Sequence, residues 1–345
     1  MSVTTHERPG VYSSYDASSM VSGSRGGKAV GIAAKSMGGT VGNIYHITRQ
    51  EEAETAFGGA DHLTELIRVL LLNGAGAVCA APVGGESDYG AAFAKLQAES
   101  DLAVIVCDSV ALSVQQALRE SVKAAAQARH ERIAVVGGGT GETVAQLVTR
   151  GEAINSERVV LVTPERADEK QGVNAAAVAG AIAAERDPAV PLGGAELRGV
   201  NGPAVQYGDG ELDLLIRGGV TPLERVGGIA SVVRGVTTRT KSGAAADKTW
   251  RELSTILIVD EVIPAIRDAL RAKFQRAKNT AQSRGAVRAQ VVLELENRVS
   301  REIIDGYENV TVSADAGDPT VCIVEFSFAV VHGMNQIWMT AHIKV

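Results

Sequence analysis

The residues with the greatest potential for chemistry form a glycine-rich run after an apolar segment. Residues 135–142 read Val-Val-Gly-Gly-Gly-Thr-Gly-Glu, and a stretch with helical periodicity follows. A strand that enters a helix through glycines can bind phosphate with its backbone N–H groups. A Walker loop, however, requires Lys and then Ser or Thr after its last glycine, and here Glu142 follows Gly141. Because this carboxylate would repel phosphate, the loop from Gly137 to Gly141 is interpreted as a tight structural turn.

Other catalytic patterns have less support. The sequence contains no Gly-x-Ser-x-Gly motif, and a triad of Asp108, Ser109 and His130 is one arbitrary combination among many. The six histidines lack the paired spacing of metal ligands, and no Cys-x-x-Cys motif occurs. We therefore expect no catalytic residue, no cofactor and no metal, and we predict that the protein is not an enzyme.

The composition is that of a folded protein, with 45% hydrophobic and 21% charged residues. A formal net charge of -6 and an aromatic content of 4% argue against direct binding to nucleic acid. Residues 63–83 are the most apolar, but Glu65 and Pro82 interrupt the run of about 20 apolar residues that a membrane span requires. The separated cysteines are expected to be small buried hydrophobes in a reducing compartment: Cys79, Cys107 and Cys322.

Apolar runs of strand length alternate with helical periodicity over the first half of the chain. We predict strands at residues 29–34, 77–81, 102–107, 133–137 and 159–163, and helices at residues 62–72, 89–99, 112–130 and 142–155. This alternation predicts an α/β fold with a mostly parallel sheet that is covered by helices. Prolines and glycines predict loops over residues 187–219, and residues 226–239 have strand character.

The last part of the chain has an α+β pattern. Helices are predicted at residues 260–281 and 286–304, with Pro264 confined to the first turn of the former, and strands at residues 320–331 and 336–345. The chain is thus expected to contain an extended N-terminal arm (1–27), an α/β domain (28–235), a C-terminal α+β domain (236–335) and a terminal strand or arm (336–345).

The terminal strand has one apolar face. Its sequence alternates Ile337, Met339, Ala341, Ile343 and Val345 with Gln336, Trp338, Thr340, His342 and Lys344. Two interpretations are open from this pattern. The strand completes a sheet of its own chain, or it adds to the sheet of a neighbouring subunit.

Six short segments carry a resemblance to a known family. They are residues 8–12 (Arg-Pro-Gly-Val-Tyr), 218–222 (Gly-Gly-Val-Thr-Pro), 233–238 (Val-Arg-Gly-Val-Thr-Thr), 307–310 (Tyr-Glu-Asn-Val), 318–322 (Asp-Pro-Thr-Val-Cys) and 331–338 (Val-His-Gly-Met-Asn-Gln-Ile-Trp). Together they resemble the contractile tail sheath proteins of phages and phage-derived bacteriocins, particularly the short forms of Gram-positive hosts. The resemblance covers nearly the whole chain and is most specific at its C-terminal end.

The resemblance implies an α/β domain that is similar to subtilisin in topology but lacks its catalytic residues. It also implies that both terminal arms join sheets in neighbouring subunits, which favours strand addition for the terminal strand. The subunit-interface residues expected on this basis are Val11, Tyr12, Gln336, Ile337, Trp338, Met339, Thr340, Ala341, His342, Ile343, Lys344 and Val345.

The expected function is that of a structural subunit that polymerises helically around an inner tube and contracts to drive the tube through a target envelope. Its expected partners are copies of itself, the inner tube protein, and baseplate and tail terminator proteins, without direct contact to nucleic acid or membrane. Assembly is expected in the bacterial cytoplasm, and the product is a virion tail or a phage-tail-like particle. The alternatives are a nucleotide-binding α/β enzyme that uses the loop from Gly137 to Gly141, and a tube or baseplate component of the same machine.

Three cations are candidates for the surface that faces the tube. Arg267, Arg271 and Lys278 are expected on one side of the predicted helix at residues 260–281, in an otherwise acidic protein. One interpretation is a solvated helix edge, since long basic side chains often flank an apolar stripe. The other is a salt-sensitive and reversible contact with acidic groups on the tube.

Overall fold

Short runs of valine, isoleucine and alanine form the central sheet of the larger domain in the computed structural model, which describes residues 26–343. The seven strands of this sheet are ordered β2-β3-β1-β4-β5-β6-β8, and neighbours are parallel except for β2 with β3. Their bounds are β1 Ala29–Lys35, β2 Tyr45–Ile47, β3 Ala77–Val83, β4 Leu102–Cys107, β5 Ile133–Gly137, β6 Val159–Val162 and β8 Val220–Thr221. The mostly parallel sheet and its five predicted strands are confirmed.

Helices cover both faces of the sheet, so the strands are buried on two sides and read as continuous apolar runs. One face packs on α1 (Gln50–Phe57), α2 (His62–Leu72) and α6 (Val173–Ala184). The other face packs on α3 (Tyr89–Ala98), α4 (Leu112–Gln127), α5 (Val144–Ile154) and α7 (Asp209–Arg217). Successive residues of one strand contribute to opposite faces: Ile32 lies in the first core and Ala33 in the second.

Several elements of this domain were not predicted from the sequence. They are α1, α6, α7, the short helix η1 (Glu86–Asp88), the strands β2 and β8, and the short strands β7 (Glu196–Leu197), β9 (Leu223–Val226), β11 (Lys241–Ser242) and β12 (Ala245–Ala246). Helix α6 shows no amphipathic period because nearly all of its residues are buried. Its Gly180 packs directly on α2, where an added Cβ would lie 2.7 Å from the carbonyl oxygen of Leu70.

Some predicted bounds were wrong. Helix α5 begins at Val144 rather than at residue 142, because the Thr143 side chain caps its N-terminus by accepting a hydrogen bond from the N–H of Gln146. Within residues 226–239, β9 ends at Val226 and β10 covers Ile229–Val232. The segment after β10 is irregular but tied to the large sheet, since the Thr238 N–H donates to the carbonyl of Val159 over 2.8 Å.

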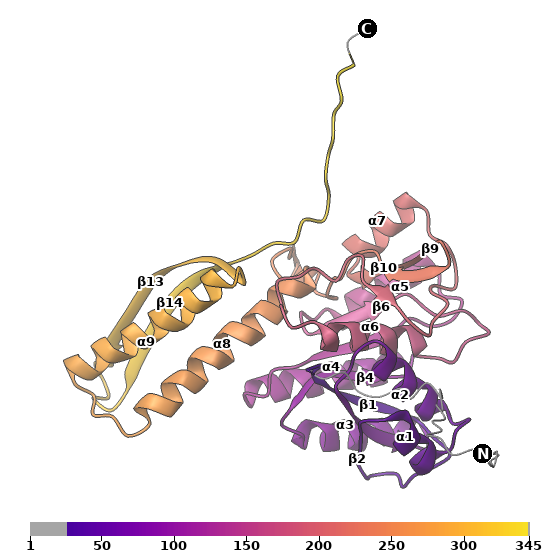
Figure 1. Cartoon of the computed structure of the whole chain (residues 1–345), viewed down its shortest axis with the longest axis horizontal. Coiled ribbons are helices and arrows are strands. Elements are labelled where there is room, and N and C mark those ends of the chain that lie inside the picture. Colours follow the sequence, from indigo (N-terminus) through magenta and orange to yellow (C-terminus); the bar gives the residue numbers. More distant parts are fainter. Residues whose placement is uncertain (1–25, 344–345) are drawn as a thin grey trace, which may run out of the picture.

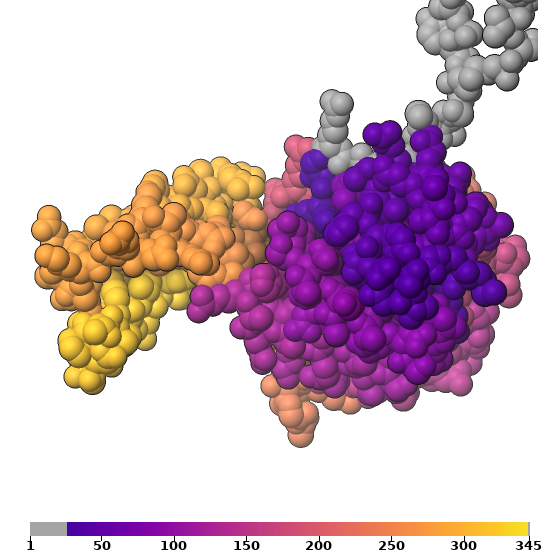
Figure 2. Space-filling model, turned by 90° about the horizontal axis from the view of Figure 1, so that it is seen from below, coloured from indigo at the N-terminus to yellow at the C-terminus, as the bar shows by residue number. Residues whose placement is uncertain are grey.

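The smaller domain consists of α8 (Leu253–Phe274), α9 (Ala281–Ser300), β13 (Ile304–Ala314) and β14 (Cys322–Val330). It projects from the α/β domain as a separate lobe, and the chain after β14 returns toward the α/β domain before it runs away from both domains (Figure 1). Figure 2 shows the same lobe beside the larger domain in the space-filling view. The helices and the hairpin enclose a small core of their own around Val262, Val291 and Leu295.

The predicted helices of this domain were displaced in sequence. Helix α8 starts at residue 253 instead of 260, so Pro264 lies in its interior and not in its first turn. An interior proline costs the helix a backbone hydrogen bond. The burial of Leu253 and Ile256 against the α/β core offsets this cost and extends the helix toward its N-terminus. Helix α9 starts at residue 281 with Gly285 inside it, and β13 occupies residues from 304 onward, a strand that was not predicted.

Helix α8 packs in both domains. Its first turns contribute Leu253 and Ile256 to the α/β core, and its later turns contribute Val262 and Ile266 to the small core. Residues before α8 also contact the large sheet, as the hydrogen bond from the Thr238 N–H to the carbonyl of Val159 shows. Within residues 26–343, no helix combines the length and the apolar character that crossing a membrane requires.

Candidate assembly interface

The segment after β14 exposes an unusual amount of apolar surface. Gly333 passes close to the α/β domain, where an added Cβ would lie 2.7 Å from the Pro191 side chain. Beyond this point Ile337 is 81% exposed, Trp338 and Met339 are each 89% exposed, and Ile343 is 87% exposed. Contiguous exposed apolar side chains of this kind are typical of a surface that another protein covers.

The same segment pairs with no strand in the described part of the chain. Residues 331–343 form no strand, so over residues 336–343, the part of the predicted terminal strand that the structure describes, no strand is present within one subunit. The backbone N–H and C=O groups of residues 336–343 therefore remain available for pairing. Val11, Tyr12, Lys344 and Val345, which were also predicted at the interface, lie outside the described residues.

The hairpin of β13 and β14 has strand edges to which a further strand could add. It is a two-stranded antiparallel sheet, so within residues 26–343 the outer edge of each strand has no neighbour. Its inner face packs on α8 and α9 through Val324, Phe326 and Phe328, while Ile323 on the outer face is 37% exposed. Sequence reasoning missed β13, although Val310 and Val312 alternate with polar residues.

The three predicted tube-facing cations do not form one row. Arg267 forms a two-fold hydrogen-bonded ion pair with Glu131 of the α/β domain, over 2.7 and 2.9 Å, so it braces the domain junction. Lys278 lies beyond the last residue of α8, Phe274, because the helix ends earlier than predicted. Arg271 borders a cleft of about 510 Å³ at the junction.

The glycine-rich loop is closed by its own side chains. The Gly139 N–H donates to a Glu142 carboxylate oxygen over 2.8 Å, and Arg150 donates to both oxygens of the same carboxylate. An anion at this turn would have to displace Glu142 from a backbone N–H and from a guanidinium. The geometry favours the structural turn over the phosphate site.

Asp108, which one arbitrary triad would use, is engaged in a buried network instead. Its carboxylate accepts from the hydroxyl of Tyr89, and it lies 3.0 Å from Nε2 of His62. The hydroxyl of Ser109 donates to Glu86. The contacts of Asp108 and Ser109 thus lead to His62 and Glu86, and neither group is paired with His130.

Comparison with known families decides the identity. The family model described as phage tail sheath protein central domain matches residues 83–238. The model described as phage tail sheath C-terminal domain matches residues 245–344. The chain belongs to the phage tail sheath protein family. Membership in this structural family confirms the sequence-based resemblance and the expectation of a structural protein rather than an enzyme.

Two curated sheath proteins are similar to this sheath chain. The tail sheath protein of Bacillus phage SP01 is 28% identical over 254 residues, which are 70% of this chain and 43% of that protein. The tail sheath protein of Mycobacterium phage Bxz1 is 25% identical over 300 residues, which are 80% of this chain and 50% of that protein. The chain therefore spans about half the length of the curated relatives that it matches.

Solved structures share the sheath fold at low identity. A chain of the cryo-EM structure of the anti-feeding prophage baseplate matches with a TM-score of 0.75 and 16% identity, covering 99% of this chain and 100% of that one. The cryo-EM structure of the anti-feeding prophage helical sheath in its contracted state matches with a TM-score of 0.72 and 16% identity, covering 98% of this chain and 99% of that one. The crystal structure of the sheath tail protein from Desulfitobacterium hafniense matches with a TM-score of 0.70 and 14% identity, covering 93% of this chain and 100% of that one.

Proposed function

We propose that this chain is the sheath subunit that polymerises helically around an inner tail tube and contracts to drive the tube through a target envelope. The observation that carries the proposal is the exposed, unpaired apolar segment at residues 336–343 together with the free edges of the β13–β14 hairpin. A strand donated by one subunit and accepted by the next forms a heterologous contact, and a heterologous contact whose rotation does not close into a ring generates a helix.

In this proposal the hairpin is the acceptor of the arms. Each arm adds a strand to a free edge of the β13–β14 sheet in a neighbouring subunit, so the arms link subunits through backbone hydrogen bonds worth roughly 0.5–1.5 kcal/mol each. A two-stranded sheet is marginal by itself, which is a reason for it to gain strands.

The proposed topology, domain division, partners and place of assembly follow from membership in the phage tail sheath protein family. We infer a subtilisin-like topology for the α/β domain, which the strand order supports, and a division into an N-terminal arm, an α/β domain, a C-terminal α+β domain and a C-terminal arm. The proposed partners are further copies of this chain, the inner tube protein, and baseplate and tail terminator proteins. Assembly in the bacterial cytoplasm yields a phage tail or a tail-like particle.

Electron microscopy of the purified full-length protein tests the proposal. A sheath subunit is expected to form helical tubes or short contracted cylinders as its concentration rises, because a non-closing contact has no terminal oligomer. Flat rings of fixed subunit number at every concentration would instead favour a baseplate component. A protein that stays monomeric at all concentrations contradicts both assignments.

A second test addresses the surface that faces the tube. Arg271 and Lys278 are exposed, and no ion pair to either is seen in the described part of the chain, whereas Arg267 is held by Glu131. The double variant Arg271→Glu, Lys278→Glu is therefore expected to weaken co-assembly of extended sheath with purified tube at low salt, and the defect should shrink at high salt. The measurement is co-sedimentation with tube across a salt series.

The control is Arg276→Glu, Lys123→Glu, which makes the same change of charge at other exposed positions. Equal co-sedimentation of the test variant and the wild type at low salt would remove Arg271 and Lys278 from the tube interface. Arg267→Glu is unsuitable as a test, because it would break the junction pair with Glu131.

A further inference from the structure

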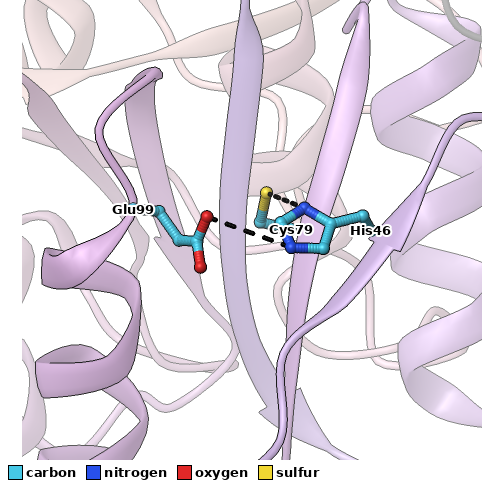
Figure 3. Close-up of side chains that lie close together, drawn as sticks. All are labelled: His46, Cys79 and Glu99. Atoms are coloured by element: carbon cyan, nitrogen blue, oxygen red, sulfur yellow. Dashed lines mark hydrogen bonds and ion pairs between the residues drawn. The ribbon is translucent and has the colours of Figure 1, made fainter.

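His46, Cys79 and Glu99 come together at one edge of the α/β sheet. The Cys79 Sγ lies 3.3 Å from Nδ1 of His46, and a Glu99 carboxylate oxygen lies 3.9 Å from Nε2 of the same ring. One ligand atom from each residue lies within 4.8 Å of the others. Figure 3 shows the dashed lines that join the two imidazole nitrogens of His46 to the thiol of Cys79 and to the carboxylate of Glu99.

The fold positions these residues with little freedom in the backbone. His46 on β2 and Cys79 on β3 are direct cross-strand partners, so their side chains share one face of the sheet. Glu99 is the C-cap residue of α3, the helix that packs on that face. Buried Arg132 fixes the end of α3, because its guanidinium donates to the carbonyls of Leu96 and Glu99.

We propose that His46, Cys79 and Glu99 bind a divalent transition metal ion of the Zn²⁺ type. Thiolate, imidazole and carboxylate are the three ligand classes that Zn²⁺ uses in proteins, and three protein ligands leave a fourth position for water. Zn–S and Zn–N bonds at a tetrahedral angle place sulfur and nitrogen about 3.5 Å apart. The observed separation of 3.3 Å between Cys79 Sγ and His46 Nδ1 is close to that value.

The remaining ligand has room to adjust. The Glu99 side chain is 32% exposed, and its ion pair to His46 is long at 3.9 Å, so a rotamer change can bring one oxygen toward the sulfur and the bound nitrogen. A Zn²⁺ ion with one thiolate and one carboxylate is electrically neutral overall, which suits a site at the rim of an apolar core.

Burial raises the pKa of Cys79 to about 11, and the negative charges of Glu99 and Asp101 add to the rise. A cysteine ligates a metal ion as a thiolate, so metal binding is expected to be accompanied by proton release. Hard cations such as Mg²⁺ prefer oxygen ligands and should not compete.

The consequence of binding is mechanical. Strand β2 has three residues and forms the edge of the sheet, where pairing to β3 is its sole ladder among the described strands. A metal ion would clamp this short edge strand to β3 and to the end of α3. The bound form should therefore resist local opening of the edge better than the metal-free form.

Cobalt titration of the metal-free full-length protein tests the site, since Co²⁺ reports thiolate ligation by a charge-transfer absorption band. We expect one Co²⁺ per chain with this band, displacement by Zn²⁺, and no displacement by Mg²⁺. The Cys79→Ser variant should lose the band. His46→Gln and Glu99→Gln should weaken binding by more than the factor of about 10 to 100 that changes outside the ligand shell cost.

Cys322→Ser is the matched control, because Cys322 is exposed and lies in β14, away from the cluster. It should bind Co²⁺ like the wild type. A band that disappears in Cys322→Ser and persists in Cys79→Ser overturns the proposal, and so does the absence of a band in the wild type. Because Glu99 is partly exposed, Glu99→Gln should keep the circular dichroism spectrum of the wild type, so its loss of binding is not a folding defect.

Discussion

Deletion of residues 336–345 is expected to give a folded, monomeric protein that forms no tubes. The side chains of this segment that the structure describes are exposed, and its backbone pairs with no strand in residues 26–343. Removing it should therefore change the free energy of unfolding by on the order of 0.5 kcal/mol or less. Loss of the donor strand, in contrast, removes several backbone hydrogen bonds and the apolar contacts from every junction of the proposed polymer.

The measurements are electron microscopy for assembly, and urea denaturation followed by circular dichroism for folding. Point variants at Ile343 separate the effect of lost strand pairing from the effect of a shortened chain. Ile343→Pro removes one backbone donor and restricts the chain, whereas Ile343→Ala keeps the donor and removes only side-chain contacts. Assembly should be impaired more by proline than by alanine at this position.

A truncated protein that folds normally and still builds ordered tubes would contradict strand exchange through the C-terminal arm. Lateral contacts between α/β domains would then have to hold the polymer together. If both Ile343 variants assembled like the wild type, pairing at that position would be excluded, and the junction would have to lie nearer to Gln336.

The α/β fold was predictable because its strands have no competing interpretation. Five buried strands appear as short valine-rich runs between amphipathic helices, and each was placed correctly. The C-terminal helices were harder, because the rule that places proline in a first turn moved the predicted start of α8 to residue 260. The burial of Leu253 and Ile256 in a different domain decides the true start, and no local pattern reveals that burial.

The assembly surface was only partly predictable. The alternation at residues 336–345 revealed a strand without revealing its partner, and the missed strand β13 left the hairpin without visible free edges. The cluster of His46, Cys79 and Glu99 has no sequence signature, since its members come from two strands and a helix end that the fold brings together. Side-chain pairs such as Arg267 with Glu131 likewise connect residues that are 136 positions apart.

Loss of one partner of the Arg158–Asp260 pair should have the largest effect on stability. The Arg158 guanidinium donates to both Asp260 oxygens over 2.7 and 2.8 Å, and the two side chains are only 12% and 13% exposed. The pair joins Arg158, the residue before β6 of the α/β domain, to Asp260 in α8. Asp260→Asn leaves a buried guanidinium without its counter-charge, so it should lower the free energy of unfolding by roughly 3–5 kcal/mol. The double variant Arg158→Met, Asp260→Leu should lose much less, which urea denaturation can measure.

The single variants Asp260→Asn and Arg158→Met should differ in how their free energy of unfolding depends on pH. Burial raises the pKa of the Asp260 carboxyl, and Arg158 opposes this rise through hydrogen bonds and charge. In Arg158→Met the opposing effect is gone, so the folded-state pKa rises further above the unfolded value. A carboxyl with a raised folded-state pKa favours folding at low pH and loses that contribution as pH rises through the folded-state pKa.

Arg158→Met should therefore recover part of its stability, relative to the wild type at the same pH, when the pH is lowered from about 7 to about 5, a range that lies above the ordinary pKa of Asp. Asp260→Asn should show no such recovery, because the guanidinium that remains does not titrate in this range. The comparison is made by urea denaturation at each pH, with the wild type as reference for the titration of all other carboxyls. Parallel pH profiles for the two variants would show that the Asp260 charge is not the source of the loss, and that the junction depends on side-chain packing of Arg158 rather than on the ion pair.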